Sequence, residues 1–260
     1  MTRSIRIVKI GGNVVNNPDA LASFLADFVK LPGQKILVHG GGREATRLSA
    51  ALGIETTMIN GRRVTDRETL DVVTMVYAGL VNKRIVAALQ ALGCDAIGLS
   101  GADADVIRAT RRPATPVDFG YVGDIDDEDV AESVLAMLLR NGLTPVFCAI
   151  THDRQGQLLN CNADSVAAAV ACAASRIHPA SLIYCFEKPG VLSDADDDNS
   201  VISLITPENY ASLRESGAVS GGMIPKIDNA FSAINRGVKS VTIKSAADLL
   251  EPTAGTVIKA

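Results

Sequence analysis

Short apolar runs alternate along this chain with longer stretches in which apolar residues recur every three or four positions. The short runs are typical of buried strands and the longer stretches of amphipathic helices. Strands are expected at residues 5–10, 35–39, 96–99, 106–109, 144–149, 182–186 and 240–243, and helices at 18–31, 42–52, 126–141, 163–175, 207–216 and 225–236. This succession predicts an α/β protein with a mainly parallel sheet covered by helices on both faces, a three-layer αβα sandwich.

Residues 56–93 interrupt the alternation. Asn60-Gly61 favours a tight hairpin turn between strands at 56–59 and 62–64. Thr65-x-x-Glu68 has the spacing of a capping box, and the apolar pattern after it continues to Gly93. We therefore expect one long helix here, serving as an internal packing element or a dimer contact.

Composition narrows the class of protein. The 260 residues are 47% hydrophobic and 21% charged with a net charge of −4, which is typical of a globular protein and unfavourable for binding nucleic acid or anionic membranes. No apolar run approaches the roughly 20 residues of a membrane span, and no signal-peptide layout opens the chain. A cytoplasmic protein is expected. Its length allows one large domain or two lobes, and the weakest seam lies near Pro179.

The five cysteines are widely spaced and form no C-x-x-C pair. This spacing argues against a disulfide framework and against a zinc site, so no metal ligands are assigned. The cysteines are interpreted as small buried hydrophobic residues.

Glycines follow several of the expected strands, at Gly11-Gly12, at Gly40-Gly41-Gly42 and at Gly98-x-x-Gly101, while Gly221-Gly222 precedes a helix. A single glycine after a strand usually serves only the turn. Ligands of such sheets gather at the carboxyl ends of the strands, and several sets of backbone amides there suit a polyphosphate and a carboxylate.

Two known phosphate-binding motifs also place glycines after a strand. No G-x-x-x-x-G-K-[ST] motif exists, which excludes a P-loop enzyme. Gly40-x-Gly42-x-x-Ala45 matches the looser dinucleotide pattern, but the acidic residue expected about 20 positions later is missing. A dinucleotide oxidoreductase remains as an alternative.

Charged residues beside the glycines are candidates for chemistry. Lys9 is the one charge late in an apolar strand, so an anionic partner is expected, and Lys226 follows Gly222 by four residues. Asn162 is expected to cap a helix, with Asp164 in its first turn where it could hold a lysine. Arg62-Arg63 follow a turn, and an arginine fork suits a substrate carboxylate.

Short motifs follow one another in order along nearly the whole chain: Val8-Lys9-Ile-Gly11-Gly12, His39-Gly40-Gly41-Gly42, Asn60-Gly61-Arg62-Arg63-Val64-Thr65, Val81-Asn82-Lys83, Leu99-Ser100-Gly101-Ala-Asp103, Tyr121-Val-Gly123-Asp124, Asn160-x-Asn162-Ala163-Asp164, Gly190-Val191-Leu192 and Gly221-Gly222-Met223-Ile-Pro225-Lys226. Their order and spacing resemble the amino acid kinase family, and within it the acetylglutamate kinases of arginine biosynthesis.

The resemblance implies a single domain over residues 1–260, with an N-terminal lobe (1–178) for the acyl-glutamate and dimerisation and a C-terminal lobe (179–260) for ATP. The implied reaction transfers the γ-phosphoryl group of ATP, with Mg²⁺, to the side-chain carboxylate of an N-acetyl- or N-succinyl-L-glutamate. Such a transfer needs positioning and charge neutralisation more than covalent chemistry.

The resemblance also implies a role for each matched residue. Lys9 and Lys226 would be catalytic and stabilise the transferring phosphoryl group, and Asp164 would orient them. The remaining roles are Gly41 and Gly42 for the reacting carboxylate, Arg63 and Asn160 for the α-carboxylate, and Gly11, Gly12, Glu187, Gly190, Val191 and Ser220 for the nucleotide.

Three residues depart from the family's pattern. Arg62 stands where an apolar residue is usual, beside the position that contacts the acyl group, and it would suit an acyl group with its own carboxylate, such as succinyl. The alternative is that Arg62 points to solvent. Arg43 replaces a proline or small residue, and Glu187 replaces a common aspartate.

Two alternatives share the fold: another carboxylate or carbamate kinase, and a non-catalytic sensor of amino acids or nucleotides. Glutamate 5-kinases and aspartokinases often carry regulatory domains, for which this length leaves no room. Arginine-inhibited relatives have an N-terminal helical extension that links dimers into hexamers, whereas only four residues precede the first expected strand. A homodimer without control by arginine is therefore expected.

Overall fold

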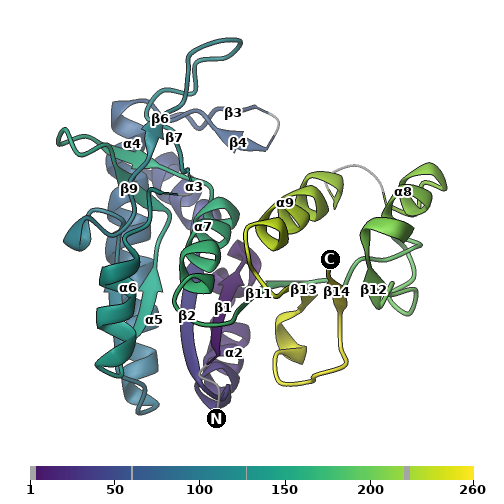
Figure 1. The fold of residues 1–260 in the computed structure, drawn as a ribbon. Coiled ribbons are helices and arrows are strands. Elements are labelled where there is room, and N and C mark those ends of the chain that lie inside the picture. The colour runs from purple at the N-terminus through teal and green to yellow at the C-terminus, as the bar shows by residue number, and fades with distance from the viewer. Residues whose placement is uncertain (1–3, 60, 127, 220–222) are drawn as a thin grey trace.

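The computed structural model describes residues 4–59, 61–126, 128–219 and 223–260, and its centre is an eight-stranded sheet (Figure 1). The strands lie in the order β12-β14-β13-β11-β1-β2-β8-β5, and every neighbouring pair is parallel except β13 and β14. Their bounds are β1 (Ile5–Ile10), β2 (Gln34–His39), β5 (Ala96–Leu99), β8 (Thr144–Phe147), β11 (Ala180–Phe186), β12 (Leu204–Ile205), β13 (Ser240–Ser245) and β14 (Thr256–Ile258). The predicted mainly parallel sheet is confirmed.

Three two-stranded sheets extend the molecule beyond the large one. They are β3 (Met58–Ile59) with β4 (Arg62–Arg63), β6 (Thr110–Arg111) with β7 (Gly123–Asp124), and β9 (Ile150–His152) with β10 (Leu158–Asn160), all antiparallel. Figure 1 shows the first two beyond the carboxyl ends of β1 and β2. The predicted pairing of the strands that flank Asn60-Gly61 is confirmed by β3 and β4, whereas Asn60 itself lies outside the described residues.

Helices cover both faces of the large sheet. They are α1 (Gly12–Asn16), α2 (Pro18–Lys30), α3 (Gly42–Ala51), α4 (Arg67–Thr74), α5 (Asn82–Ala91), α6 (Glu132–Arg140), α7 (Ala163–Ser175), α8 (Pro207–Glu215) and α9 (Met223–Asn235), with short 3₁₀ turns η2 (Asp103–Asp105) and η3 (Ala246–Asp248). The α6, α7 and α9 side shares one core with Ile5 and Ile7, and the α2 and α5 side shares another with Val8 and Ile10. Because side chains alternate along β1, Lys9 lies on the α7 side.

The long helix predicted before Gly93 is one continuous run made of α4, a π-helical segment η1 (Met75–Val81) and α5. Its N-cap differs from the prediction: Asp66, not Thr65, accepts the amide of Thr69 at 2.8 Å. Thr65 is fully buried, and its hydroxyl donates to the carbonyl of Arg63 instead. Because the hydroxyl of Thr65 is engaged in bonds outside the helix, the next residue, Asp66, caps it.

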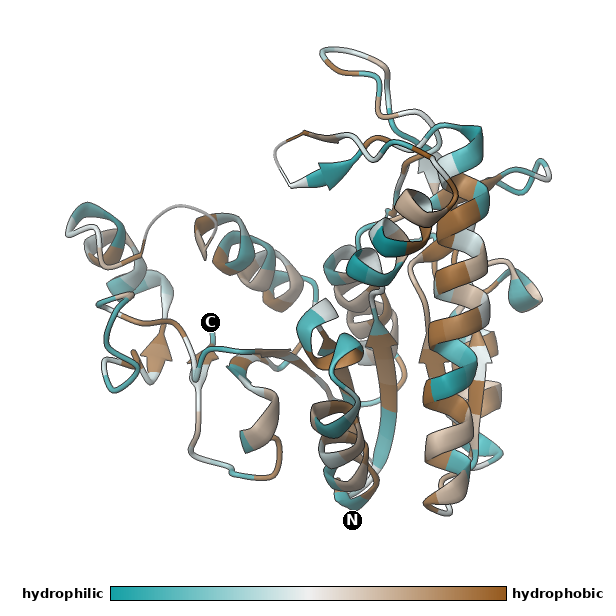
Figure 2. Cartoon of the chain, turned by 180° about the vertical axis from the view of Figure 1, so that it is seen from behind, coloured by the Kyte–Doolittle hydropathy of each residue, from teal (hydrophilic) through white to brown (hydrophobic). Residues whose placement is uncertain are grey.

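The long helix combines a charge-free stretch, residues 72–82, with charged residues on both sides of it, so the expectation that no apolar run approaches a membrane span stands. Within the described part of the chain, Arg67–Ala91 is the one helix whose length and mean hydropathy of 1.5 would allow it to cross a membrane. In the fold it packs on the sheet through buried Val73, Ile85 and Leu89. Figure 2 shows its other side at the surface, where Met75 is 53% exposed.

Asn82, where the π-helical segment ends, ties this helix to the sheet. Its Nδ2 donates to the carbonyl of Val146 at 2.9 Å and to Nε2 of His39 at 3.0 Å, while Nδ1 of His39 donates to the carbonyl of Gly40 at 2.7 Å. Burial lowers the pKa of His39 to about 4, so the ring is neutral and can accept this bond.

Other differences concern local boundaries. The predicted strand 106–109 forms only isolated bridges at Ile107 and Arg108, although Val106 and Ile107 are fully buried. Its backbone turns back on Gly101, whose carbonyl accepts the amide of Ile107 at 3.0 Å. The helix predicted to begin at residue 126 begins at Glu132. All five cysteines are buried, as predicted.

Candidate active site

The loop Gly40–Gly42, between β2 and α3, separates two cavities and lines both of them. One cavity, of about 560 Å³, contains Lys9 and Lys226 and is called the lysine cavity. The other, of about 200 Å³, contains Arg62, Arg63 and Arg112 and is called the arginine cavity. A ligand in either cavity therefore lies against the same glycines.

Gly41 must be glycine because of its neighbour Tyr77. A Cβ on Gly41 would lie 2.8 Å from the Tyr77 ring, which is closer than real Cβ contacts. Tyr77 is held in the π-helical segment of the long helix and is buried, which raises the pKa of its hydroxyl. The glycine loop thus packs on a rigid ring and is fixed between the two cavities.

In the lysine cavity, the ammonium group of Lys9 forms an ion pair with Asp164. Lys9 Nζ lies 2.6 Å from Asp164 Oδ1, and only 7% of Lys9 is exposed. The predicted anionic partner of Lys9 is confirmed. Asp164 is held in the first turn of α7, whose N-cap Asn162 accepts the amides of Asp164 and Ser165 at 2.7 and 3.3 Å, as predicted.

Lys226 approaches the same place from α9. Its Nζ lies 3.8 Å from the centroid of the Phe186 ring, and Lys9 Nζ lies 5.3 Å from that centroid. Burial lowers the pKa of Lys226, the charge of Asp164 partly offsets this, and the charge of Lys9 lowers it further. Two ammonium groups share one carboxylate, so the site carries uncompensated positive charge suited to a polyanion.

In the arginine cavity, Arg63 is 8% exposed, and its hydrogen-bond acceptors among the described residues are all neutral. Its Nη2 donates to the carbonyl of Gly42 at 2.9 Å and to Thr46 at 2.8 Å, and its Nη1 donates to Thr56 at 3.2 Å. The guanidinium charge remains available for a bound anion. Asn160 lies in the same cavity, with its Nδ2 donating to Thr65 Oγ1 at 3.0 Å.

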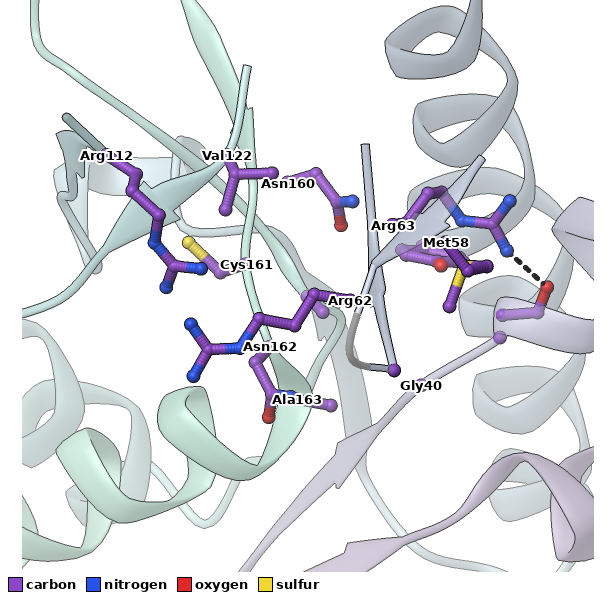
Figure 3. A pocket seen from close by; sticks show the side chains of 15 residues that line it. Gly40, Met58, Arg62, Arg63, Arg112, Val122, Asn160, Cys161, Asn162 and Ala163 are labelled. Atoms are coloured by element: carbon purple, nitrogen blue, oxygen red, sulfur yellow. Dashed lines mark hydrogen bonds between the residues drawn. The ribbon is translucent and has the colours of Figure 1, made fainter. Parts of the chain in front are cut away.

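Arg62 and Arg112 complete the cationic lining of this cavity (Figure 3). Arg112, next to β6, is oriented by Asp124 of β7, which accepts from its Nε at 2.9 Å and also from its Nη2. Figure 3 shows the guanidinium groups of Arg62 and Arg112 directed toward the same part of the cavity, near Cys161 and Asn162.

Most residues selected from the sequence line one of the two cavities. The lysine cavity contains Lys9, Gly11, Gly12, Gly41, Gly42, Asp164, Glu187, Gly190 and Lys226, and the arginine cavity contains Gly41, Gly42, Arg62, Arg63 and Asn160. Arg43 lines the lysine cavity as well. Val191 does not line either: it is 1% exposed and its amide donates to Thr256 Oγ1 at 2.8 Å. Ser220 lies outside the described residues.

Sequence reasoning missed Tyr77 and Arg112. Tyr77 is one of many apolar residues on a long helix, and only the π-helical turn directs it at the glycine loop. Arg112 belongs to the pair Arg111-Arg112, which resembles Arg62-Arg63 and could have been selected on that basis. The neighbouring strands β6 and β7 have two residues each, which is too short for an alternating pattern of apolar and polar residues.

Comparison with known proteins agrees with this geometry. A profile of the amino acid kinase family matches residues 4–245. The chain is 53% identical over 259 residues to an acetylglutamate kinase from Phocaeicola vulgatus, covering 100% of both chains, and 50% identical over 259 residues to one from Bacteroides thetaiotaomicron, again covering 100% of both. A crystal structure of a Streptococcus mutans protein is similar with a TM-score of 0.80 and 28% identity, covering 98% of each chain.

Proposed function

The chain belongs to the amino acid kinase family, and we propose that it transfers the γ-phosphoryl group of ATP to the side-chain carboxylate of an N-acyl-L-glutamate in arginine biosynthesis. N-acetyl-L-glutamate is the substrate in the names of its full-length relatives. The observation that carries the proposal is the glycine loop shared by the lysine and arginine cavities. It lets a phosphoryl donor in one cavity meet a carboxylate bound in the other.

The donor side of the reaction uses Lys9 and Lys226. Negative charge on the phosphoryl oxygens and on the leaving nucleotide must be stabilised as the group transfers. Two ammonium groups fixed around Phe186 supply that charge without reorganisation. Asp164 positions Lys9 through their 2.6 Å ion pair and moderates the repulsion between the two lysines.

The acceptor side of the reaction uses the arginine cavity. Arg63 and Asn160 bind the α-carboxylate, and Gly41 and Gly42 bind the reacting side-chain carboxylate at the start of α3. The partial positive charge of a helix N-terminus favours an anion at that position. The product is an acyl phosphate, because the attacking oxygen belongs to a carboxylate.

The nucleotide lies along Gly11, Gly12, Glu187 and Gly190, with Val191 and Ser220 as further predicted contacts. The described residues contain no group of three or more histidine, cysteine or acidic side chains that could hold a metal. The lysine cavity would suit Mg²⁺ bound to the nucleotide phosphates, and Asp164 and Glu187 are the carboxylates in its lining that would lie near the ion. Bound there, the ion supplies neutralisation of phosphate charge.

The proposal includes the organisation of the protein. Strands β1, β2, β5 and β8 of residues 1–178 form one half of the sheet order, and the strands of residues 179–260 form the other, which supports an acyl-glutamate lobe and an ATP lobe. Exposed Met75, Gly79 and Ala87 on the long helix support a homodimer through this face. Use of ATP supports a cytoplasmic location.

The test is ATP-dependent formation of an acyl phosphate, trapped with hydroxylamine, from N-acetyl-L-glutamate. Trapped hydroxamate with ATP and Mg²⁺ is expected, with none from free glutamate at equal concentration. A protein that binds ATP without forming hydroxamate from any N-acyl-glutamate would instead be a sensor, and one that uses carbamate would be a kinase of another class.

A further inference from the structure

The arginine cavity contains more positive charge than an N-acetyl-L-glutamate can use. Among the described residues that line it, three are arginines and none is acidic. The proposed substrate places two carboxylates near this cavity, one at Arg63 and Asn160 and one at the glycine loop. Arg62 and Arg112 are left facing the space that remains, where the N-acyl group must lie.

Arg112 is prepared for an anion. Its side chain is 17% exposed, and it is held by Asp124 on one edge and by the ring of Phe119 at 5.4 Å. Its remaining terminal nitrogen, Nη1, is buried and has no hydrogen-bond partner among the residues that the structure describes. Buried N–H groups are nearly always paired, so an unpaired one at a cavity wall indicates a ligand atom.

Arg62 faces Arg112 from the β3–β4 hairpin. It lines the cavity, and within the described ranges it has no ion-pair or hydrogen-bond partner. Figure 3 shows the two guanidinium groups directed at one region. Asp124 already pairs with one edge of Arg112, whereas Arg62 has no acidic partner among the described residues, so a carboxylate between the two guanidinium groups would pair with Arg62 and accept from the buried Nη1 of Arg112.

The remaining wall of this region suits a short hydrocarbon chain. Val122 and Cys161 are 7% and 6% exposed, and both line the cavity beside Arg112. Burial raises the pKa of Cys161 to about 12, so its thiol is neutral and acts as an apolar surface. An acyl group with methylenes along Val122 and Cys161 would end between the two arginines.

We infer that Arg62 and Arg112 are specificity-determining residues for an N-acyl-L-glutamate whose acyl group ends in a second carboxylate, as in N-succinyl-L-glutamate. The inference rests on the proposed function and names the acyl group that this site takes. An acetyl group carries no charge to pair with either guanidinium and would leave the buried Nη1 of Arg112 without an anionic partner.

The test compares kcat/KM for three substrates: N-succinyl-L-glutamate, its terminal amide N-succinamoyl-L-glutamate, and N-acetyl-L-glutamate. The amide keeps the shape and removes the charge. We expect the succinyl compound to exceed both others on the order of tenfold or more, the effect of one lost charge-assisted contact.

Variants then assign that preference to residues. In Arg62→Gln and Arg112→Gln the ratio of succinyl to acetyl kcat/KM should fall on the order of tenfold or more. Arg111→Gln is the matched control, because Arg111 lies on β6, is 52% exposed at its side chain and faces Asp118 away from the cavity. Its ratio should equal that of the wild type.

The outcomes separate the inference from the proposed function. If acetyl-glutamate is preferred, or if the ratio is unchanged in Arg62→Gln, the inference is overturned while the kinase assignment stands. A fall for both substrates by the same factor also overturns it, because the arginines would then serve the common part of the substrate. If no N-acyl-glutamate is phosphorylated, the proposed function itself fails. Because Arg62 is exposed, Arg62→Gln should fold, and it tests the inference even if Arg112→Gln unfolds.

Discussion

The lysine cavity and the arginine cavity share three glycines but handle charge differently. In the lysine cavity the buried ammonium of Lys9 is paired with Asp164 at 2.6 Å. In the arginine cavity the buried guanidinium of Arg63 is held by neutral oxygens of Gly42, Thr46 and Thr56. A carboxylate suits a site where charge moves during the reaction, and neutral acceptors suit one where a fixed substrate charge must bind.

The largest expected effect comes from removing a lysine. Lys226→Ala should lower kcat on the order of 10²–10³-fold or more, because its ammonium stabilises charge that develops only in the transition state. The KM values should change far less. Steady-state kinetics against Lys239→Ala, an exposed lysine outside both cavities, provides the control. A decrease in ATP affinity with kcat unchanged would indicate a binding role instead.

A smaller effect, and one confined to the acceptor, is expected from Arg63. Arg63→Lys keeps the charge but loses the forked geometry, so KM for the acyl-glutamate should rise on the order of tenfold or more with KM for ATP little changed. Thermal unfolding of the same variant checks the lost bonds to Thr46 and Thr56. Equal increases in both KM values would contradict the separation of the two cavities.

The shared loop is expected to affect both sides. Gly41→Ala should lower kcat/KM for both substrates on the order of tenfold, because the new Cβ would lie 2.8 Å from the Tyr77 ring and displace the loop. Gly53→Ala, just after α3, is the control: no atom lies within 4 Å of its Cβ, and although its φ of +73° should cost some stability in an alanine, kcat/KM should be unchanged. Partial recovery of activity in Gly41→Ala with Tyr77→Ala would assign the loss to this contact.

The smallest effect concerns pH. Activity requires protonated Lys226, and burial holds the pKa of this group below the ordinary value of 10.5. As pH rises, kcat/KM should therefore fall through a limb below that value. In Asp164→Asn the carboxylate that raises the pKa of Lys226 is gone, so the residual activity should fall at still lower pH. If kcat/KM of this variant fell at the same pH as that of the wild type, a group other than Lys226 would be responsible for the fall.

The sequence predicts best where one physical cause dominates. Strand β1 is found at its predicted bounds because a run of apolar residues ends in glycines, and the charge of Lys9 late in that run correctly predicts an anionic partner, which is Asp164. Asn162 caps α7 as predicted, because its side-chain oxygen accepts the amides of Asp164 and Ser165 in the first turn. Only the family resemblance predicted that Lys9 and Lys226 lie in one site, because they are 217 positions apart and no local sequence pattern connects them.

Failures occur where tertiary contacts override local preference. Thr65 has the spacing of a cap, but it is fully buried and bonds to Asn160, so Asp66 caps the helix. Residues 106–109 have the composition of a strand, but among the described residues they pair only through single bridges, of Ile107 with Val130 and of Arg108 with His152. Arg112, which follows β6, is oriented in the arginine cavity by Asp124 of β7, twelve positions later in the chain, and no local pattern predicts this contact.

The π-helical turn Met75–Val81 makes the molecule unequally tolerant of two kinds of genetic change. Such a turn holds one residue more than an α-helical turn. Exchanging a side chain within it leaves the direction of the rest of the helix intact. Deleting one residue would convert it into an α-helical turn, so Asn82 beyond it would keep its bonds to His39 and Val146, but Tyr77 within it would be redirected away from Gly41. The segment should therefore tolerate exchanged side chains better than the loss of one residue, and that loss should disturb the glycine loop and not the anchoring of the helix at Asn82.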